Sequence, residues 1–487
     1  TPTVTREIEA SSLWQTIVES ATTTAEPGLL MWGNVERFLP ADAYASDGFK
    51  TISTNPCGEI PLSAYDSCRL ISINLKNFVN NRFTPDAEFD YEGFASTVSI
   101  AMRLSDDLVE LETEKLTTII ESADTDDEKV MWNKLLNACH QGRRTGLGTH
   151  GLADALACMN LSYDSDDALK VVGTIYETLR NEAYRESVIL ARERGAFPIF
   201  DWNKDQNSEF IKNLPTDITQ LIAEYGRRNI SILTNAPTGS VSIMSQTSSG
   251  IEPVFRNKYI RRRKLDTTEG EADFVDALGD RWKEFTVFHH NAQEWREMFG
   301  EDTELPDFFV ESDSIDWIKR VEVQSMIQRS IDHAISSTIN LPAGTDPEVV
   351  AQIYRQGWKR GLKGVTVYVD GSRTGDLVTN TEQSEEVFPQ RAAPSRPEVL
   401  DCDIHHTTIK GEKWVVLIGL LDGRPYEVLG GEASLIEIPK KYDTGRLTKR
   451  NFKTKNNRYD LSFGYNGDTI TINDVVKVFD NPNNAGF

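Results

Sequence analysis

The residues best suited to chemistry lie at positions 55–59, which read Asn-Pro-Cys-Gly-Glu, and at Cys68, eleven positions after Cys57. An amide, a thiol and a carboxylate alternate there with Pro and Gly, a pattern that predicts a rigid, tight loop presenting three polar heads to one small molecule. Glu59 can act as a general base, and the amide of Asn55 can orient a hydroxyl. Cys57 can serve as nucleophile, metal ligand or hydrogen-atom carrier, or only as a small apolar filler of a turn.

The elements that must position these groups follow from periodicity. Residues 70–75 alternate apolar side chains with Ser and Asn, which predicts a strand with Cys68 just ahead of it, so that the two thiols can meet. Helices are expected over 10–20, 94–111, 129–140, 166–194, 315–332 and 346–361. Further strands are expected at 230–234, 334–341 and 365–369. This alternation predicts an α/β fold with parallel strands and helices outside them.

A second candidate site lies where the strand predicted at 230–234 turns into a helix. The turn consists of Pro237, Thr238, Gly239, Ser240, Val241 and Ser242. Small hydroxyl residues and a glycine leave backbone N–H groups uncovered at a positive helix end, which suits a phosphate. Simple helix capping by Thr238 or Ser240 explains the same pattern, and it is the interpretation that the residues alone favour.

Other motifs carry weaker signals. Residues 146–151 match the dinucleotide fingerprint by letters, but a helix is predicted before them and no acidic strand end follows, so a nicotinamide-dependent oxidoreductase is only an alternative. The basic run 261–264 is typical of a solvated loop, with a phosphate or partner contact as the alternative. Neither 289–290 nor 402–406 has a complete set of ligands at metal-site spacing, so no metal is predicted and zinc at 402–406 is a minor alternative.

Composition limits the class of protein. The chain has 487 residues, enough for about two to four domains. A net charge of −23 argues against broad nucleic-acid or membrane surfaces and still allows a local phosphate pocket. The absence of a long apolar run or signal peptide predicts a soluble cytoplasmic protein. Five cysteines, an odd and sparse set, fit a reducing compartment with functional thiols.

Taken together, these motifs resemble the ribonucleotide reductase catalytic subunit. Residues 55–62 and 67–75 are similar to its finger loop and the following strand, and the cysteine of that loop is the thiyl radical in the family. Similar stretches recur at 143–148, 151–154, 336–342 and 361–373. The glycines of 146–151 then imply a structural role, letting a helix pack closely.

The resemblance also gives the turn at 237–242 a function. In ribonucleotide reductases a Pro-Thr-Ala-Ser-Thr-Ser turn holds the substrate diphosphate, and this chain has Gly239 for Ala and Val241 for Thr. Both changes keep the N–H donors, and one hydroxyl is lost. Residues 248–255 resemble the adenosylcobalamin-dependent branch in particular. The class that receives its radical from a partner subunit carries two adjacent tyrosines where this chain has Val367 and Tyr368, so the resemblance implies adenosylcobalamin as cofactor.

The residue roles that follow are implied by the resemblance. Cys57 would take the ribose 3′ hydrogen, Glu59 would accept the 3′-hydroxyl proton and Asn55 would position the sugar. Cys68, with a cysteine outside this chain, would supply two electrons as the 2′-hydroxyl leaves as water. The expected partners are a ribonucleoside di- or triphosphate substrate and a dithiol reductant such as thioredoxin. A non-catalytic role in assembling such an enzyme is the alternative.

The domain prediction combines pattern and resemblance. Residues 1–379 are expected to be the C-terminal half of a ten-stranded α/β barrel with its finger loop. Residues 380–398 are polar, contain proline and lack periodicity, so a linker is expected. Residues 399–487 are expected to form a small β-rich domain, truncated at its C-terminus, with hairpin turns at 422–423 and 466–467. The N-terminal half is expected on another chain, through a split gene or a fragment, and the lone chain is expected to be inactive.

Overall fold

The computed structural model describes most of the chain. The described residues are 7–264, 273–275, 281–372, 396–409, 412–436, 438–450, 458–465 and 468–479. Among the helices that they form, none combines the length and the apolar character needed to cross a membrane.

The chain divides into two compact units. One consists of Thr1–Phe274 and Trp282–Glu382, and the other of Val275–Arg281 and Gln383–Phe487. The predicted linker, 380–398, lies outside the described residues except for its last three positions. The domain boundaries expected at 379 and 399 therefore stay predictions.

The first part of the chain alternates helices and strands. In order, the elements up to the turn at 239 are α1 (Ala10–Thr24), β1 (Leu29–Leu30), α2 (Trp32–Phe38), η1 (Pro40–Asp47), β2 (Thr51–Thr54), β3 (Pro61–Ser63), β4 (Leu70–Asn74), η2 (Leu75–Phe78), β5 (Val79–Asn80), β6 (Glu88–Phe89), α3 (Tyr91–Ser122), α4 (Asp126–Gly142), β7 (Gly146–His150), α5 (Leu152–Cys158), α6 (Asp166–Arg194), α7 (Trp202–Asp205), α8 (Glu209–Lys212) and α9 (Thr216–Tyr225). They continue with α10 (Gly239–Ser245), β8 (Lys258–Lys264), β9 (Phe274–Val275), β10 (Arg281–Phe288), α11 (His290–Phe299), α12 (Trp317–Gln328), β11 (Thr338–Leu341), α13 (Pro347–Lys359) and β12 (Gly364–Val369).

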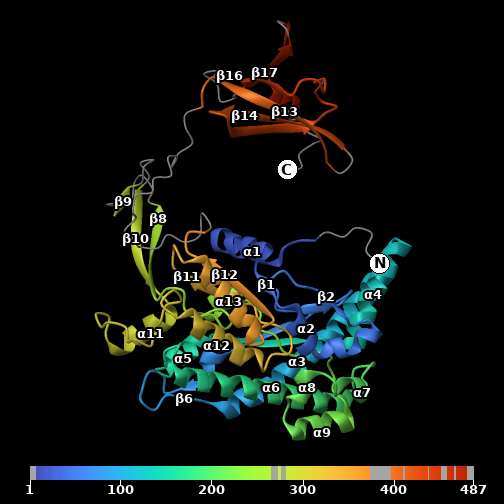
Figure 1. Ribbon diagram of the computed structural model, residues 1–487, viewed down its shortest axis with the longest axis vertical. Coiled ribbons are helices and arrows are strands. Elements are labelled where there is room, and N and C mark those ends of the chain that lie inside the picture. The colour runs from blue at the N-terminus through green and yellow to red at the C-terminus, as the bar shows by residue number, and fades with distance from the viewer. Residues whose placement is uncertain are drawn as a thin grey trace. The chain divides into compact units, whose positions relative to one another are not determined.

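Parallel backbone segments run through the middle of this unit (Figure 1). β4 pairs in parallel with β7, and β11 pairs in parallel with β12. The segment 231–235 joins the two pairs through parallel bridges, Leu147↔Leu233 on one side and Asn235↔Ile335 on the other. The strands expected at 230–234 and 334–341 are thus extended and paired, although only β11 is a regular strand. Within the described residues these segments do not close into a barrel.

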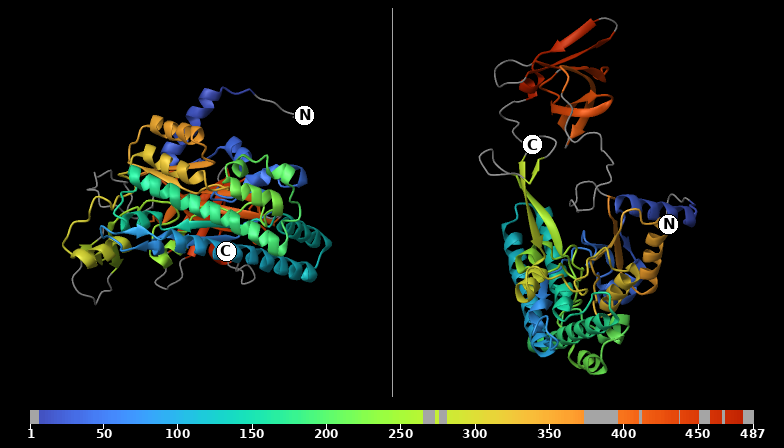
Figure 2. Two further views of the ribbon diagram at one scale, coloured as in Figure 1. Left: turned by 90° about the horizontal axis from the view of Figure 1, so that it is seen from below. Right: turned by 90° about the vertical axis from the view of Figure 1, so that its left-hand side faces the viewer.

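Helices cover the strands, as the alternation predicted. α3 packs against β4 and β7, while α12 and α13 pack against β11 and β12. The long α6 lies beside both α3 and α12 (Figure 2). Burial of a large apolar side chain on such a face contributes about 1.5–3 kcal/mol, and α6 alone buries Val172, Ile175, Tyr176, Leu179 and Val188. This apolar layer fixes the positions of the strands that carry the candidate site.

Local signals set the helix ends. The hydroxyl of Ser165 accepts from the amide of Ala168 at 3.1 Å, and α6 stops before Gly195, whose φ is +88°. The predicted bounds 166–194 are those observed. α4 begins with a capping box between Thr125 and Glu128.

The expected role of the glycines at 146–151 is wrong in one respect. Gly146 and Gly148 lie inside β7, and the atoms that a side chain on either would meet belong to neighbouring extended segments, not to a helix. A side chain on Gly146 would overlap the sulfur of Cys68, and one on Gly148 would overlap the main-chain oxygen of Thr234. The glycines therefore allow close approach between neighbouring strands. A dinucleotide fingerprint has its glycines in the turn after a strand, so their place here also removes support for the nicotinamide alternative.

The second unit is a six-stranded antiparallel sheet in the order β15-β14-β13-β16-β17-β18. Its elements are β13 (Val399–Ile409), β14 (Glu412–Leu421), β15 (Arg424–Glu432), β16 (Thr444–Arg450), β17 (Arg458–Tyr465), β18 (Asp468–Ile472) and α14 (Val475–Phe479). The hairpin predicted at 422–423 forms, with positive φ at both turn residues. The turn expected at 466–467 lies outside the described residues. Cys402 is buried in the core of this unit, and the described residues contain no cluster of three or more metal-ligating side chains.

Candidate active site

The loop at 55–59 forms the tip of a small hairpin between β2 and β3. The side-chain oxygen of Asn55 accepts from the amide of Ile60 at 3.0 Å, and its main-chain oxygen accepts from the amide of Gly58 at 3.1 Å. Gly58 has φ +78°, which favours glycine. Asn55 thus closes the loop with its oxygen, while its Nδ2 has no partner within the described part of the chain.

Cys57 is exposed at the tip of this loop. Partial desolvation of the sulfur and, after it, the negative charge of Glu59 raise the pKa of the Cys57 thiol. The group is therefore a protonated S–H at neutral pH, poorly suited to be a thiolate nucleophile or metal ligand. An S–H with free access is what a hydrogen-atom donor requires.

Glu59, two positions after Cys57, is buried, with only 2% of its surface exposed. Its Oε2 is buried without a hydrogen-bond partner among the described residues. A buried carboxylate oxygen without a partner is costly unless a ligand supplies a donor. The main-chain oxygen of the same residue accepts from the amide of Ala334 at 2.9 Å and from the hydroxyl of Thr234 at 2.8 Å.

Cys68 stands just ahead of β4, as predicted, and its sulfur lies against Gly146. Burial raises the pKa of the Cys68 thiol, although Arg144 and Arg69 act in the opposite direction. Both this thiol and that of Cys57 are free. No contact between the two sulfurs occurs among the described residues, so their expected approach stays a prediction.

A buried cluster of Arg144, Asp66 and His333 lies next to the loop, where Arg144 donates to the main-chain oxygen of Pro61. Arg144 is fully buried, and its Nε pairs with Asp66 Oδ2 at 2.6 Å. Its Nη1 lies 3.1 Å from Nε2 of His333. Burial, followed by the charges of Arg144 and Lys363, holds the pKa of His333 well below its usual range, so the ring is neutral. Sequence reasoning missed this group because its members lie far apart along the chain.

The turn at 237–242 leads into α10, with Pro237, Gly239, Ser240 and Val241 exposed and with Thr238 and Ser242 buried. The hydroxyl of Thr238 accepts from the amide of Gly250 at 2.8 Å and makes no capping bond to the helix. Capping by Thr238 is therefore wrong. Ser242 donates to the main-chain oxygen of Gly239 at 3.0 Å. The first amides of a helix have no intrahelical acceptor, so those of 239–241 can serve a ligand.

Two histidines that the sequence did not single out as functional tie this turn to the strands. His150, at the end of β7, lies 2.8 Å from Ser72 Oγ through Nδ1 and 3.1 Å from Ser245 Oγ through Nε2. Burial lowers the pKa of His150. The ring of His289 is hydrogen-bonded to Asp154 at 2.7 Å, and Asp154 in turn accepts from the amide of Ser248. Residues 249 and 250 are hydrogen-bonded to Thr238. By fixing Ser248, the pair of His289 and Asp154 therefore supports the turn at 237–242.

Comparisons with known proteins agree over both units. Residues 2–368 match the family described as ribonucleotide reductase, barrel domain, and residues 400–486 match the NrdJ homologue C-terminal domain. A Mycobacterium tuberculosis protein named vitamin B12-dependent ribonucleoside-diphosphate reductase is 28% identical over 394 residues, covering 77% of this chain and 49% of that protein. A Thermoplasma acidophilum protein of the same name is 28% identical over 396 residues, covering 79% and 46%.

The solved structure of the Actinobacillus ureae class Id ribonucleotide reductase alpha subunit matches with a TM-score of 0.50 and 20% identity, covering 74% of this chain and 61% of that one. At that identity the match concerns the fold. The chain spans about half the length of the curated relatives it matches. Because the barrel-domain match takes in three quarters of its residues, the chain belongs to the ribonucleotide reductase family.

Proposed function

We propose that this chain carries the radical-bearing half of an adenosylcobalamin-dependent ribonucleotide reductase, which reduces ribonucleotides to deoxyribonucleotides. The observation that carries the proposal is the loop at 55–59. It presents a protonated, exposed thiol at Cys57 two positions before a buried carboxylate, Glu59, one oxygen of which has no partner in the described part of the chain. A hydrogen-atom carrier and a general base in one short loop suit removal of a ribose hydrogen and an adjacent hydroxyl proton.

The steps follow from these groups. The thiyl form of Cys57 takes the 3′ hydrogen of the ribose, and Oε2 of Glu59 accepts the 3′-hydroxyl proton. The free Nδ2 of Asn55 donates to the sugar. The 2′-hydroxyl leaves as water, and two thiols, that of Cys68 and one outside this chain, supply two electrons and two protons as they form a disulfide. Cys57 then returns the hydrogen atom to the 3′ carbon, which restores the thiyl form. A dithiol such as thioredoxin then restores both thiols.

The substrate is a ribonucleoside di- or triphosphate, and its phosphates are assigned to the turn at 237–242. Support comes from the exposed amides at the start of α10 and from the fixed position of Thr238 against 249–250. No atom of the described residues lies within 4 Å of where a side chain on Gly239 would begin, so the turn is open to a ligand.

Two features support adenosylcobalamin as the radical source. The relatives above are named for vitamin B12. In the class that receives its radical from a partner subunit, a tyrosine stands at the position of Val367 on β12 and relays an electron, which a valine cannot do. The exposed S–H of Cys57 fits such a cofactor, which would have to approach over Pro56 and Cys57. When bound, adenosylcobalamin supplies a hydrogen-atom acceptor by homolysis of its cobalt–carbon bond.

We also propose that the parallel segments form one five-stranded half of a ten-stranded barrel, with 1–379 as the barrel part, 380–398 as a linker and 399–487 as a β-rich accessory domain. β4, β7, 231–235, 333–341 and β12 supply the five strands. β1 pairs with part of the outer edge of β12, at Leu29 and Leu30. A second half, expected on another polypeptide, would cover the outer edge of β4 and the rest of β12, which otherwise favour association.

The test is the variant Cys57→Ser in the complete reductase. The oxygen–hydrogen bond of serine is too strong for the radical relay, so deoxyribonucleotide formation should disappear while substrate affinity changes less than twofold. Cys402→Ala removes a thiol from the second unit and should retain activity. Substantial turnover by the Cys57 variant would refute the proposed function.

A further inference from the structure

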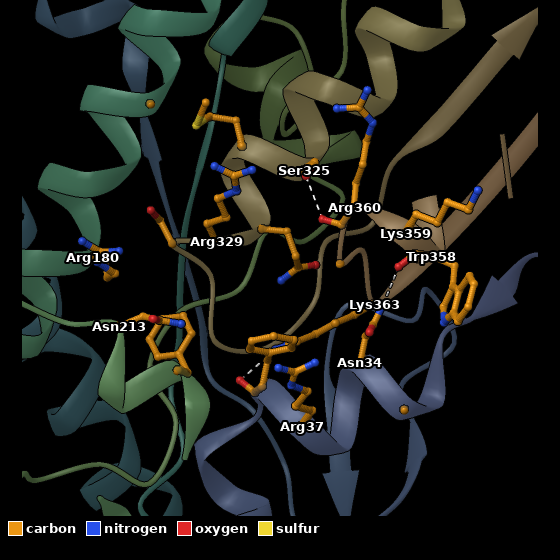
Figure 3. A pocket seen from close by; sticks show the side chains of 18 of the residues that line it. Asn34, Arg37, Arg180, Asn213, Ser325, Arg329, Trp358, Lys359, Arg360 and Lys363 are labelled. Carbon is orange, nitrogen blue, oxygen red and sulfur yellow. Dashed lines mark hydrogen bonds between the residues drawn. The ribbon is translucent and has the colours of Figure 1, made fainter. Parts of the chain in front are cut away.

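A cavity of about 860 Å³ lies among α2, α6, α12, α13 and the turn that leads into β12 (Figure 3). We call it the basic cavity because six cationic side chains line it: Arg37, Arg180, Arg329, Lys359, Arg360 and Lys363. Among its described lining residues, Glu177 is the only carboxylate. Figure 3 shows Arg180, Arg329 and Arg37 on separate elements around the opening, with Lys359 and Trp358 on a further side.

The basic cavity is distinct from the candidate active site. Gln328 and Arg329 precede the segment 333–341, and Lys363 precedes β12, so they lie at the starting edge of the parallel strands. His150 and the turn at 237–242 follow their strands and lie at the opposite edge.

Most of the positive charge in the cavity is not neutralised by ion pairs. Within the described residues Arg329 and Lys359 have no ion pair, and Arg37 has only the ring of Phe38, 5.0 Å from its guanidinium. Arg180 donates to the side chain of Asn181 at 3.0 Å. Burial lowers the pKa of Arg180, and Glu177 opposes this only in part.

Arg360 and Lys363 are already engaged. Arg360 pairs with Glu322 at 3.1 Å. Lys363 donates to the main-chain oxygens of Phe38 and Asp332, and burial lowers its pKa to about 7. For the remaining four cations, the described lining of the cavity supplies a single carboxylate, that of Glu177.

Helix ends explain part of this arrangement. Arg37 and Lys359 lie in the last turns of α2 and α13, and Arg329 follows the end of α12. Each helix C-terminus carries about half a negative charge, which favours a cation there. Arg180 lies in the middle of α6, so this reason does not apply to it. The negative charge of three helix C-termini and of Glu177 together is still smaller than the positive charge of the four cations.

A buried acceptor gives an independent indication of a ligand. Gln328 is 5% exposed, and its Nε2 donates to the main-chain oxygens of Ile331 and His333, which fixes the orientation of the amide. Its Oε1 is buried without a hydrogen-bond partner among the described residues. Such an oxygen is satisfied when a bound molecule brings a hydroxyl donor, which the ribose of a nucleotide has and a phosphate chain does not. The indole of Trp358, 59% exposed at the edge of the cavity, offers a flat apolar surface.

We propose that the basic cavity binds a small molecule carrying at least two linked phosphate groups, at a site separate from the catalytic loop. Guanidinium groups bind phosphate oxygens in pairs, and the volume lies within the range of about 300–1,000 Å³ usual for small-molecule sites. In a chain with net charge −23, a positive concavity concentrates anions locally. The shared chemistry is the polyphosphate chain, whose source is either an inorganic polyphosphate or a nucleoside triphosphate.

The test is calorimetric titration of the full chain with sodium tripolyphosphate and, separately, with ATP. The double variant Arg37→Gln/Arg329→Gln should weaken tripolyphosphate binding at least tenfold. The double variant Arg180→Gln/Lys359→Gln, with its changes on α6 and α13, should also weaken tripolyphosphate binding at least tenfold. The matched control is Arg192→Gln/Arg355→Gln, which removes two exposed cations outside the cavity and should change affinity less than twofold.

These variants also separate the basic cavity from the turn at 237–242, which is assigned to the substrate. Trp358→Ala identifies the source of the phosphate chain. If this variant binds ATP more weakly and tripolyphosphate as before, the ligand is a nucleotide. If its affinities for both ligands equal those of the unaltered chain, the phosphate chain alone is recognised. Absence of tripolyphosphate binding to the unaltered chain would overturn the proposal. Equal binding by folded cavity and control variants, checked by circular dichroism, would overturn it as well.

Discussion

The main-chain oxygen of Glu59 accepts a hydrogen bond from the amide of Ala334, with an N···O distance of 2.9 Å. This bond joins the catalytic loop to the segment that continues into β11, 275 positions later along the chain. Since the hydroxyl of Thr234 donates to the same oxygen, two parallel segments hold the loop through its backbone. The side chain of Glu59 is thereby left free for chemistry.

Glu59→Gln should lower kcat in the complete reductase by about 10²–10⁴-fold, the usual contribution of a general base. Gln has the same shape and cannot accept the 3′-hydroxyl proton. Because the main chain anchors the loop, the melting temperature should not fall. Steady-state kinetics and a thermal melt check both points, and a kcat within twofold of the original would contradict the assigned role.

Thr234→Val should loosen the loop without touching the substrate. The change keeps the shape and removes the hydroxyl, so the free energy of unfolding should fall by about 1–2 kcal/mol. Amide hydrogen exchange of the peptide 55–60, followed by mass spectrometry, should become faster. Thr174→Val on the exposed face of α6 is the matched control and should leave both measurements unchanged; the same loss in both variants would refute the anchoring role.

Cys68→Ser should block the reducing step and spare radical generation. With adenosylcobalamin and substrate added to the complete reductase, cobalt–carbon homolysis, followed by visible absorption, should persist, while product formation stops. Cys57→Ser should lose both. If homolysis disappears as completely in the Cys68 variant, the division of roles between the two thiols is wrong.

Asp106→Asn should change the acid stability of the protein. Burial would raise the pKa of Asp106, but Arg143 and Arg228 outweigh it, so the folded-state pKa lies below the usual value of an aspartate. The carboxylate therefore stabilises the fold above about pH 4, the unfolded value, and this stability is lost as pH falls through the folded pKa.

The variant should thus lose about 3 kcal/mol at pH 7, because it leaves Arg143 and Arg228 without their buried partner. Between pH 6 and pH 3 the free energy of unfolding should fall less in the variant than in the original protein. Chemical denaturation across this range is the measurement. Asp107→Asn, a change at the neighbouring exposed carboxylate, should follow the original curve, and parallel curves for all three proteins would contradict the assignment.

Local signals in the sequence determined much of the fold. The bounds of α6 follow from Ser165 before it and Gly195 after it, and the hairpin at 422–423 follows from Asp-Gly between two apolar runs. The loop at 55–59 was visible for the same reason, since its functional residue types are neighbours in the chain. Each of these features depends on atoms a few positions apart, so residue order alone specifies them.

Contacts between distant segments were decided by the tertiary structure. The anchors of Glu59, the pairing of Asp154 with His289 and the basic cavity join residues more than 100 positions apart. Gly148 was misassigned because its neighbour, the main-chain oxygen of Thr234, belongs to another strand. A sequence pattern records which face of an element is apolar, but not which strand will lie beside it. Strand order depends on the packing of the whole sheet and its helices, and the polar contacts across it exist only once that order is set.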